Sequence, residues 1–142
     1  MTVQQDPAAV PRVLPRLDLH TKAFWTGGAN AQLLIARCRD CSRWVHPPVA
    51  DCPNCGGPLE PTPVSGDGVV FTYTVNYQQF HPAVVPPYVI ALVELPEQPG
   101  LRIAANIAGC DPEAVAIGMA VRVEFEQHEH VFVPVFTPRD VT

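Results

Sequence analysis

Four cysteines form two closely spaced pairs in the first half of the chain. Cys38 and Cys41 are separated by two residues, ten residues follow, and Cys52 and Cys55 repeat the same spacing. A turn of this length presents two sulfurs to one ion, and two such turns complete a tetrahedral shell. The pattern predicts a structural Zn²⁺ site whose four positions are all filled by protein, which disfavours Lewis-acid catalysis. Iron bound by the same sulfurs, or redox thiols, are the alternatives.

The remaining residues with chemical potential do not assemble into a catalytic set in the sequence. Cys110 has no base beside it and is expected to be a small buried residue. His128 and His130 could share a metal from one face of a strand, but they lack a third ligand and are expected in an exposed hairpin. No Ser-His-Asp, Cys-His or paired-carboxylate arrangement is recognisable, so we expect no catalytic residue in this chain.

A short amphipathic helix is expected ahead of the cysteines. Leu19, Ala23 and Phe24 fall at helical spacing. Asp18 is a candidate for the N-cap, and Gly27-Gly28 would end the helix.

Proline and glycine mark the expected domain boundaries. Residues 1–16 contain three prolines and little apolar periodicity, which predicts a flexible arm. The helix and the zinc ribbon are expected over residues 17–62, with a strand at residues 32–37 leading into the first cysteine pair. Dense glycine and proline then predict a boundary, followed by a domain at residues 63–138 and a tail at residues 139–142.

Alternation of apolar and polar residues predicts five strands after this boundary. They are expected at residues 69–77, 88–95, 101–107, 119–125 and 131–135. A short helix between the third and fourth strands would be capped by Asp111 and ended by Gly118. This order is typical of an OB-fold barrel, and a five-stranded open sandwich is the alternative. The predicted fold class is therefore mainly β, with an N-terminal helix and zinc ribbon followed by a five-stranded OB-fold barrel.

The first two of these strands carry the candidate interaction residues. The first strand is expected to place one set of apolar side chains on a single face: Val69, Phe71, Tyr73, Val75 and Tyr77. The proline-rich connection to the second strand is stiff and apolar, which suits a binding edge. Its candidate partner-interface residues are Phe80, His81, Pro86 and Tyr88. A loop that merely folds back over the barrel is the alternative.

The distribution of charge bears on the class of partner. Residues 1–60 carry a net charge of +1 and residues 61–142 a net charge of −6. Zinc ribbons and OB-folds both bind nucleic acids in other proteins, but an OB groove for single strands needs a basic track. The acidic barrel therefore disfavours nucleic acid as a partner. An electron carrier of the rubredoxin type is a second rival, which iron–sulfur absorption would support.

The sequence gives no indication of a membrane association. It has no apolar run of about 18 residues, the length that spans a bilayer. Its first residues lack the basic start and apolar stretch of a secretory signal. We expect a cytoplasmic protein, and reducing conditions there favour metal binding by the cysteines over disulfide bonds.

Several segments resemble one known family. They are the expected helix with Phe24 and Trp25, the segment CRDCSRWVHPPVADCPNCGG with both cysteine pairs, and the strand segments SGDGVVFTYTVNYQ and PPYVIALVEL. Together they resemble proteins with a rubredoxin-like zinc ribbon and an OB-fold, which are described as acyl-CoA-associated and were long catalogued as a domain of unknown function. The resemblance covers residues 17–138. Ser42 is a departure, because the family often has glycine there.

The resemblance implies a partner rather than a reaction. Members of the family are small subunits of thiolase-superfamily enzymes or of hotdog-type enoyl-CoA hydratases. Some relatives pair with thiolase-like aldolases that cleave a β-hydroxyacyl-CoA during steroid side-chain degradation. The resemblance therefore implies a hetero-oligomer in which a non-catalytic, zinc-containing chain shares an acyl-CoA substrate with a thiolase-like subunit.

A CoA phosphate would need positive charge, which is concentrated in the N-terminal half. The candidate acyl-CoA contacts are Arg16, Lys22, Arg37, Arg39 and Arg43. The alternative is that these are ordinary solvated residues around an anionic zinc–thiolate centre.

Overall fold

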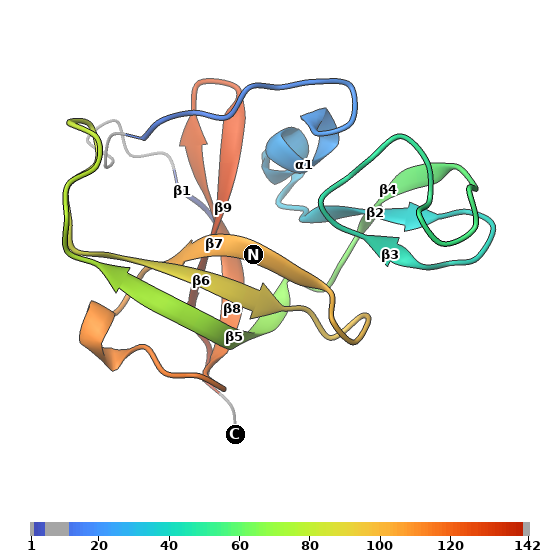
Figure 1. The fold of residues 1–142 in the computed structure, drawn as a ribbon. Coiled ribbons are helices and arrows are strands. Elements are labelled where there is room, and N and C mark those ends of the chain that lie inside the picture. Colours follow the sequence, from blue (N-terminus) through green and yellow to red (C-terminus); the bar gives the residue numbers. More distant parts are fainter. Residues whose placement is uncertain (1, 5–11, 141–142) are drawn as a thin grey trace.

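The computed structural model, which describes residues 2–4 and 12–140, consists of a small three-stranded sheet beside a β-barrel (Figure 1). Helix α1 (Lys22–Thr26) and the 3₁₀ turn η1 (Gly27–Asn30) come first. The small sheet has the order β3-β2-β4, formed by β2 (Leu34–Cys38), β3 (Trp44–Val45) and β4 (Leu59–Pro63). The predicted mainly β fold, with a helix and ribbon ahead of a barrel, is confirmed.

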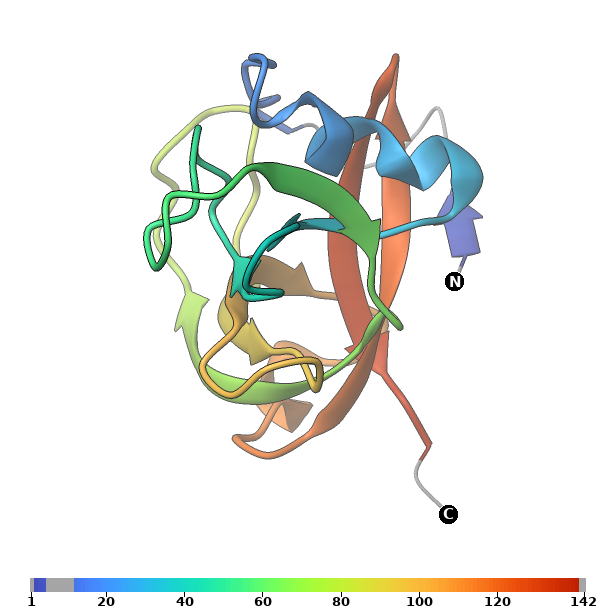
Figure 2. The same ribbon diagram turned by 90° about the vertical axis from the view of Figure 1, so that its right-hand side faces the viewer.

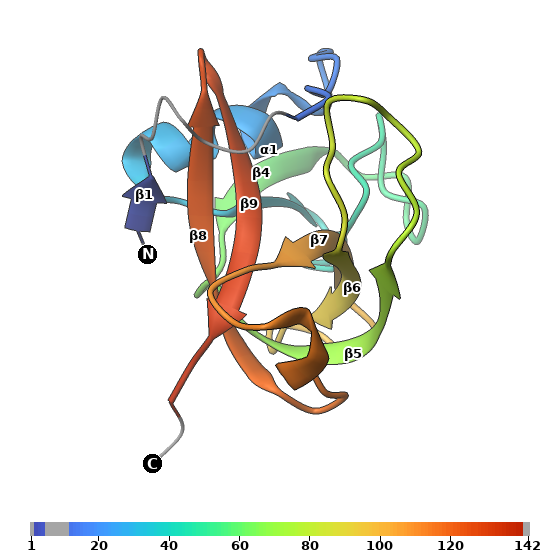
Figure 3. The same cartoon turned by 90° about the vertical axis from the view of Figure 1, so that its left-hand side faces the viewer.

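Five strands close the barrel, and all of their pairings are antiparallel except that of the third strand with the fifth. Its strands are β5 (Asp67–Asn76), β6 (Tyr88–Glu94), β7 (Arg102–Ile107), β8 (Ala120–His128) and β9 (Val131–Pro138). Their order is β8-β5-β6-β7-β9, and the β8–β9 hairpin joins the two ends. A three-residue strand, β1 (Thr2–Gln4), pairs with β8 in parallel (Figure 3). Closure excludes the open sandwich and leaves the apolar faces of all five strands in one core.

Strand β5 departs from the predicted alternation. Its pairing with β6 is irregular between Val70 and Thr72, where a residue is inserted. Val70 is fully buried ahead of this point, so Val69 and Phe71 face outward with 43% and 44% of their surfaces exposed. Tyr73 packs on the core beyond it. The prediction of one continuous apolar face is therefore wrong, because the bulge reverses the facing of part of the strand.

The N-terminal helix is shorter than predicted. Asp18 caps no helix; its carboxylate accepts hydrogen bonds from the backbone N–H groups of His20 and Thr21 in a preceding turn. Leu19 lies in this turn and is 90% exposed rather than on a buried helical face. The helix itself begins at Lys22. The Asp18 side chain binds these backbone N–H groups in a turn, and such local hydrogen bonds are an alternative to a longer helix.

A close backbone approach fixes the helical segment against the barrel. A Cβ at Gly28 would lie 2.4 Å from the Cβ of Phe132 and 2.8 Å from the Phe125 ring, so glycine is needed there. The paired glycines thus do not simply end the helix, as predicted, but let η1 pack on the β8–β9 hairpin. This outer cover explains why both faces of β9 are buried along most of its length.

The other predicted helix is a single 3₁₀ turn, η2 (Pro112–Ala114), in which the Asp111 side chain accepts a hydrogen bond from the Glu113 N–H as expected of a cap. Cys110, just before it, is half-buried and packs against the core. Across residues 12–140 every helical segment is short, and none has the length and apolar character needed to cross a bilayer.

The turn between β6 and β7 forms hydrogen bonds with the ribbon, which lies beside this end of the barrel (Figure 2). The side-chain amide of Gln98 accepts a hydrogen bond from the Trp44 N–H at 2.9 Å and donates one to the Trp44 carbonyl at 3.0 Å. The neighbouring Glu97 carboxylate accepts from the Ser65 N–H at 2.9 Å. The same turn therefore holds both the ribbon and the linker that leads from the ribbon into the barrel.

Candidate metal centre and interaction surfaces

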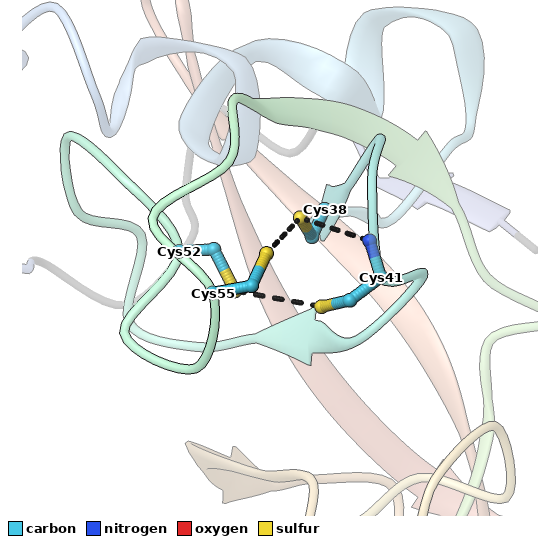
Figure 4. A group of neighbouring side chains, drawn as sticks. All are labelled: Cys38, Cys41, Cys52 and Cys55. Carbon is cyan, nitrogen blue, oxygen red and sulfur yellow. Dashed lines mark hydrogen bonds between the residues drawn. The ribbon is translucent and has the colours of Figure 1, made fainter.

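The four paired cysteines converge on one point between the two ribbon turns (Figure 4). Their sulfurs all lie within 4.8 Å of one another, with Cys38 and Cys55 at 3.4 Å and Cys41 and Cys52 at 3.7 Å. A tetrahedral ion with metal–sulfur bonds of about 2.3 Å requires sulfurs about 3.8 Å apart. The geometry fits a four-sulfur metal-binding site, and no ligand position is left for substrate.

Local backbone geometry produces this convergence. The N–H groups of Asp40 and Cys41 both donate to Cys38 Sγ at 3.4 Å, which fixes the first turn around its sulfur. A Cβ at Gly57 would lie 3.0 Å from the same sulfur, so the second turn needs glycine to approach. Ser42 has a φ of +64°, in the left-handed region that favours glycine. Glycine would adopt this conformation at a lower cost than serine.

The thiols differ in how readily they ionise. The backbone N–H of Arg43, followed by the Asn54 side chain, lowers the pKa of Cys41 to about 6. The backbone N–H of Gly57 also lowers the pKa of Cys55, but the adjacent sulfurs of Cys38 and Cys41 outweigh it and raise that pKa to about 12. Close packing of four sulfurs therefore favours sharing protons among them, and a bound cation would replace those protons.

The candidate CoA-binding cations do not form one cluster. The Arg39 guanidinium pairs with Glu60 at 3.2 Å, and both side chains are exposed. Arg37 lies 4.7 Å above the Trp44 ring and donates to the Ser42 carbonyl at 2.9 Å, so it serves the ribbon itself. Of the five candidate cations, the other three are exposed, and their side chains have no polar contact within residues 12–140: Arg16, Lys22 and Arg43.

The proline-rich loop between β5 and β6 projects from the barrel at the opposite end from the ribbon (Figure 1). Phe80 in this loop is 72% exposed. The adjacent His81 is also exposed, and its Nδ1 accepts a hydrogen bond from the Ala83 N–H at 3.0 Å. Pro86 and Tyr88 are half-buried at its base, where the Tyr88 hydroxyl accepts from the Asn76 amide. The candidate interface residues therefore belong to a single loop that is distant from the metal site.

A groove beside this loop contains residues that carried no signal in the sequence. Its volume is about 490 Å³, and its walls come from the loop, from strands β6 and β7, and from Arg12 and Val13. Arg12 Nε lies 2.7 Å from Glu126 Oε1, and Arg12 Nη1 donates to Asn106 Oδ1 at 2.7 Å. These partners lie 94 and 114 residues away along the chain, so no local pattern could have linked them.

The two histidines of the β8–β9 hairpin do not form a metal site within the described residues. His128 Nε2 lies 3.4 Å from Glu126 Oε1, and His130 is exposed in the turn. The group of potential metal ligands found across residues 12–140 consists of the four cysteines alone.

Two family profiles match adjoining parts of the chain. The rubredoxin-like zinc ribbon domain of ChsH2 matches residues 25–60, and the C-terminal OB-fold domain of ChsH2 matches residues 61–126. A DUF35 domain-containing scaffold protein of Methanocaldococcus jannaschii is 38% identical over 100 residues, which are 67% of this chain and 68% of that protein. This chain belongs to the ChsH2 (DUF35) family. The resemblance noted in the sequence is thereby confirmed.

Other relatives of this ChsH2-family chain are longer proteins. It is 38% identical over 140 residues to a probable enoyl-CoA hydratase alpha subunit of Thermomonospora curvata, covering 96% of this chain and 42% of that one. It is 40% identical over 121 residues to the 3-oxo-4,17-pregnadiene-20-carboxyl-CoA hydratase alpha subunit of Mycobacterium tuberculosis, covering 84% and 37%. The chain thus spans less than half the length of these two relatives.

Solved structures show the same architecture. A chain of the Ltp2-ChsH2(DUF35) aldolase superposes with a TM-score of 0.77 at 37% identity, covering 88% of this chain and 98% of that chain. A DUF35-family protein of Sulfolobus solfataricus superposes with a TM-score of 0.60 at 19% identity, covering 83% and 84%, and shares the fold.

Proposed function

We propose that this chain is a zinc-stabilised accessory subunit of a thiolase-superfamily acyl-CoA enzyme, and that this enzyme is a retro-aldolase acting on a steroid side-chain β-hydroxyacyl-CoA. The observation that carries the proposal is the 37% identity to a chain of the Ltp2-ChsH2(DUF35) aldolase, 98% of which is covered. The pregnadiene-carboxyl-CoA in the name of the Mycobacterium tuberculosis relative supports a steroid thioester as the substrate.

The role proposed for the metal is structural. Four thiolates around one Zn²⁺ would satisfy its coordination and link the turn before β3 to the turn before β4. Cys38 and Cys52 are buried, so the site forms the centre of the ribbon's own small core. The ion would therefore supply folding free energy to the ribbon.

The carbon–carbon bond cleavage is assigned to the partner, and this chain is assigned binding. The exposed loop at Phe80 and His81 is proposed to contact the thiolase-like subunit, together with Pro86 and Tyr88 at its base. The shared acyl-CoA would meet this chain through its phosphates. Of the five candidate cations, those without a polar partner within residues 12–140 are the better placed: Arg16, Lys22 and Arg43.

A hydratase partner is the second candidate. It is favoured by the two relatives named as hydratase alpha subunits, of which this chain matches 42% and 37%. In that case the chain would accompany a hotdog-type hydratase and not an aldolase. An acyl-CoA thiolase is a third form of the same accessory role. Single-stranded nucleic acid is disfavoured by the net charge of −6 over residues 61–142.

Co-expression tests the aldolase assignment. The chain is produced together with the Ltp2 subunit of the related Ltp2-ChsH2(DUF35) aldolase. The purified pair is then assayed for retro-aldol cleavage of a steroid β-hydroxyacyl-CoA. We expect co-elution in size-exclusion chromatography, and activity that the isolated chain lacks. Cleavage by the isolated chain would exclude a purely accessory role. Hydration of the enoyl-CoA in company with a hydratase beta subunit, without binding to Ltp2, would favour the second candidate.

Charge reversal tests the CoA contact within an active pair. Arg43→Glu should raise the KM for the CoA thioester with little change in kcat, because a phosphate contact far from the reacting atoms contributes uniform binding. Arg39→Glu serves as the matched control, since Arg39 is already paired with Glu60 in the same ribbon. Equal KM values for wild type and Arg43→Glu would reject the contact.

A further inference from the structure

Exposed apolar side chains gather on one side of the barrel. Four of them lie on the outer face of β5 and β6 and are 38–44% exposed: Val69, Phe71, Ile90 and Leu92. Ile90 also lines the 490 Å³ groove, together with Val85 of the loop and Val13 of the N-terminal segment. The six side chains and the groove are referred to here as the apolar face. Exposed apolar groups bordered by polar residues on a folded protein are typical of interaction sites.

The segment that borders the groove has an unusual polarity. Arg12 points toward the barrel with 22% of its side chain exposed and is held by Glu126 and Asn106. Its neighbour Val13 points outward and is 60% exposed. A free surface segment would be expected to expose its charge and bury its valine. The reverse arrangement satisfies the arginine internally and leaves an apolar ridge beside the groove.

The charges beside the apolar face are already paired. Arg102 lies 3.5 Å above the Phe71 ring and forms an ion pair with Glu94 at 3.0 Å. Asp67 pairs with Arg122 at 3.2 Å at the same end of the sheet. Because these arginines are already paired with carboxylates, the face offers little positive charge to the phosphates of a nucleic acid or of an anionic bilayer.

Several polar groups of the groove already form hydrogen bonds within the chain. Asn106 accepts from Arg12 and donates through Nδ2 to the Val89 carbonyl at 2.7 Å. The Tyr88 hydroxyl is bonded to Asn76. Small-molecule sites orient their ligands through a few free polar groups. A groove in which Arg12 and Asn106 are already hydrogen-bonded within the chain, and whose other walls are mainly apolar, suits an apolar side chain from another protein, as at the centre of a protein interface.

We propose that the apolar face is the docking surface for the partner subunit, and that the groove receives an apolar side chain from that subunit. The occupant is a different protein whose contacting surface is apolar and uncharged. This inference rests on the proposed accessory function, and the two-protein Ltp2-ChsH2(DUF35) assembly of the related chain is what favours a second protein over a second copy. Arg12 is a positioning residue, because it fixes the segment that forms one wall of the groove.

Association with the Ltp2 subunit tests the proposal. The double variant Ile90→Thr/Leu92→Thr removes apolar surface and retains residues that favour strands. We expect its Kd for Ltp2 to rise about tenfold or more, the effect of losing roughly 1.4 kcal/mol at an interface centre. Ile117→Thr is the matched control, because Ile117 is 68% exposed but lies outside the apolar face. Its Kd should remain that of the wild type.

A measurement on the wild-type chain avoids dependence on folding of the variants. Hydroxyl-radical footprinting should show protection of Phe71, Ile90 and Leu92 in the Ltp2 complex and unchanged oxidation of Ile117. Arg12→Met should weaken binding while zinc content stays the same.

The outcomes separate the inference from the proposed function. Tight binding of Ltp2 by both wild type and double variant, with Phe71 still oxidised in the complex, would overturn the apolar face and leave the accessory function standing. Absence of binding by the wild type would overturn both. A wild-type homodimer that the double variant converts to monomer would assign the face to a second copy and overturn the proposal.

Discussion

His46 is expected to make the fold less stable as the pH falls. It lies half-buried between ribbon and helix, with its ring 5.0 Å from the ring of Phe24. Its Nδ1 is buried and has no hydrogen-bond partner within residues 12–140. Burial lowers the pKa of this imidazole from 6.5 to about 4. The folded protein therefore holds His46 neutral under conditions in which the unfolded chain would protonate it.

The sign and size follow from linkage between protonation and folding. Between the two pKa values the unfolded state binds more protons, so stability is lost as the pH falls from 6.5 toward 4. With these two values the loss between pH 7 and pH 5 is about 2 kcal/mol. The cysteine thiolates also take up protons in acid, which weakens metal binding. The contribution of His46 must therefore be measured as a difference between variants.

His46→Phe keeps an aromatic contact with Phe24 and removes the titrating group. Urea unfolding with excess zinc at pH 7, 6 and 5 would give the free energy of unfolding of each protein. The free energy of unfolding of the variant, minus that of the wild type, should increase by about 2 kcal/mol when the pH is lowered from 7 to 5. His130→Phe, at an exposed position in the β8–β9 turn, is the control and should follow the wild type. A constant difference between His46→Phe and wild type across this range would refute the reasoning.

Three further changes test the metal site, the ribbon attachment and the ribbon turn. Cys52→Ser should remove zinc and lower the melting temperature together, measured by metal analysis and calorimetry; a full melting temperature without zinc would contradict a structural role. Gln98→Ala should cost about 1–3 kcal/mol in urea unfolding, since two hydrogen bonds to Trp44 are lost, and should leave zinc content unchanged. Ser42→Gly should stabilise the protein by up to about 1 kcal/mol, because position 42 is left-handed, and unchanged or lower stability would count against strain there.

The metal site and the barrel strands were accessible from the sequence because both depend on local patterns. Two residues between paired cysteines fix a turn whatever surrounds it. At and just before β7, Leu101, Ile103, Ala105 and Ile107 alternate as the pattern predicts; Ala105 is half-buried against the core and the other three are buried. Such signals come from the period of the element itself, so no long-range contact is needed to recognise them.

The parts that the sequence did not reveal depend on long-range packing. Residues 69–71 are all apolar, so alternation alone could not show which of them faces the core once a bulge shifts the register. The contacts of Arg12 join three chain segments, and a lone arginine in a proline-rich stretch looks like any solvated residue. The proposed apolar face depends on these two features, so the sequence pointed only to the neighbouring loop at Phe80 as a candidate interface.

The position of the turn between β6 and β7 suggests how the two ends of the molecule depend on each other. Gln98, in this turn, holds the ribbon, while the strand before it carries Ile90 and Leu92 on the apolar face. The barrel is closed by β8 and β9, which make no contribution to the metal centre. Loss of the metal would thus loosen the ribbon as far as Gln98 without opening the sheet. The sheet that carries the apolar face would stay closed after metal loss, so we expect the proposed docking to depend on the apolar face and not on the metal.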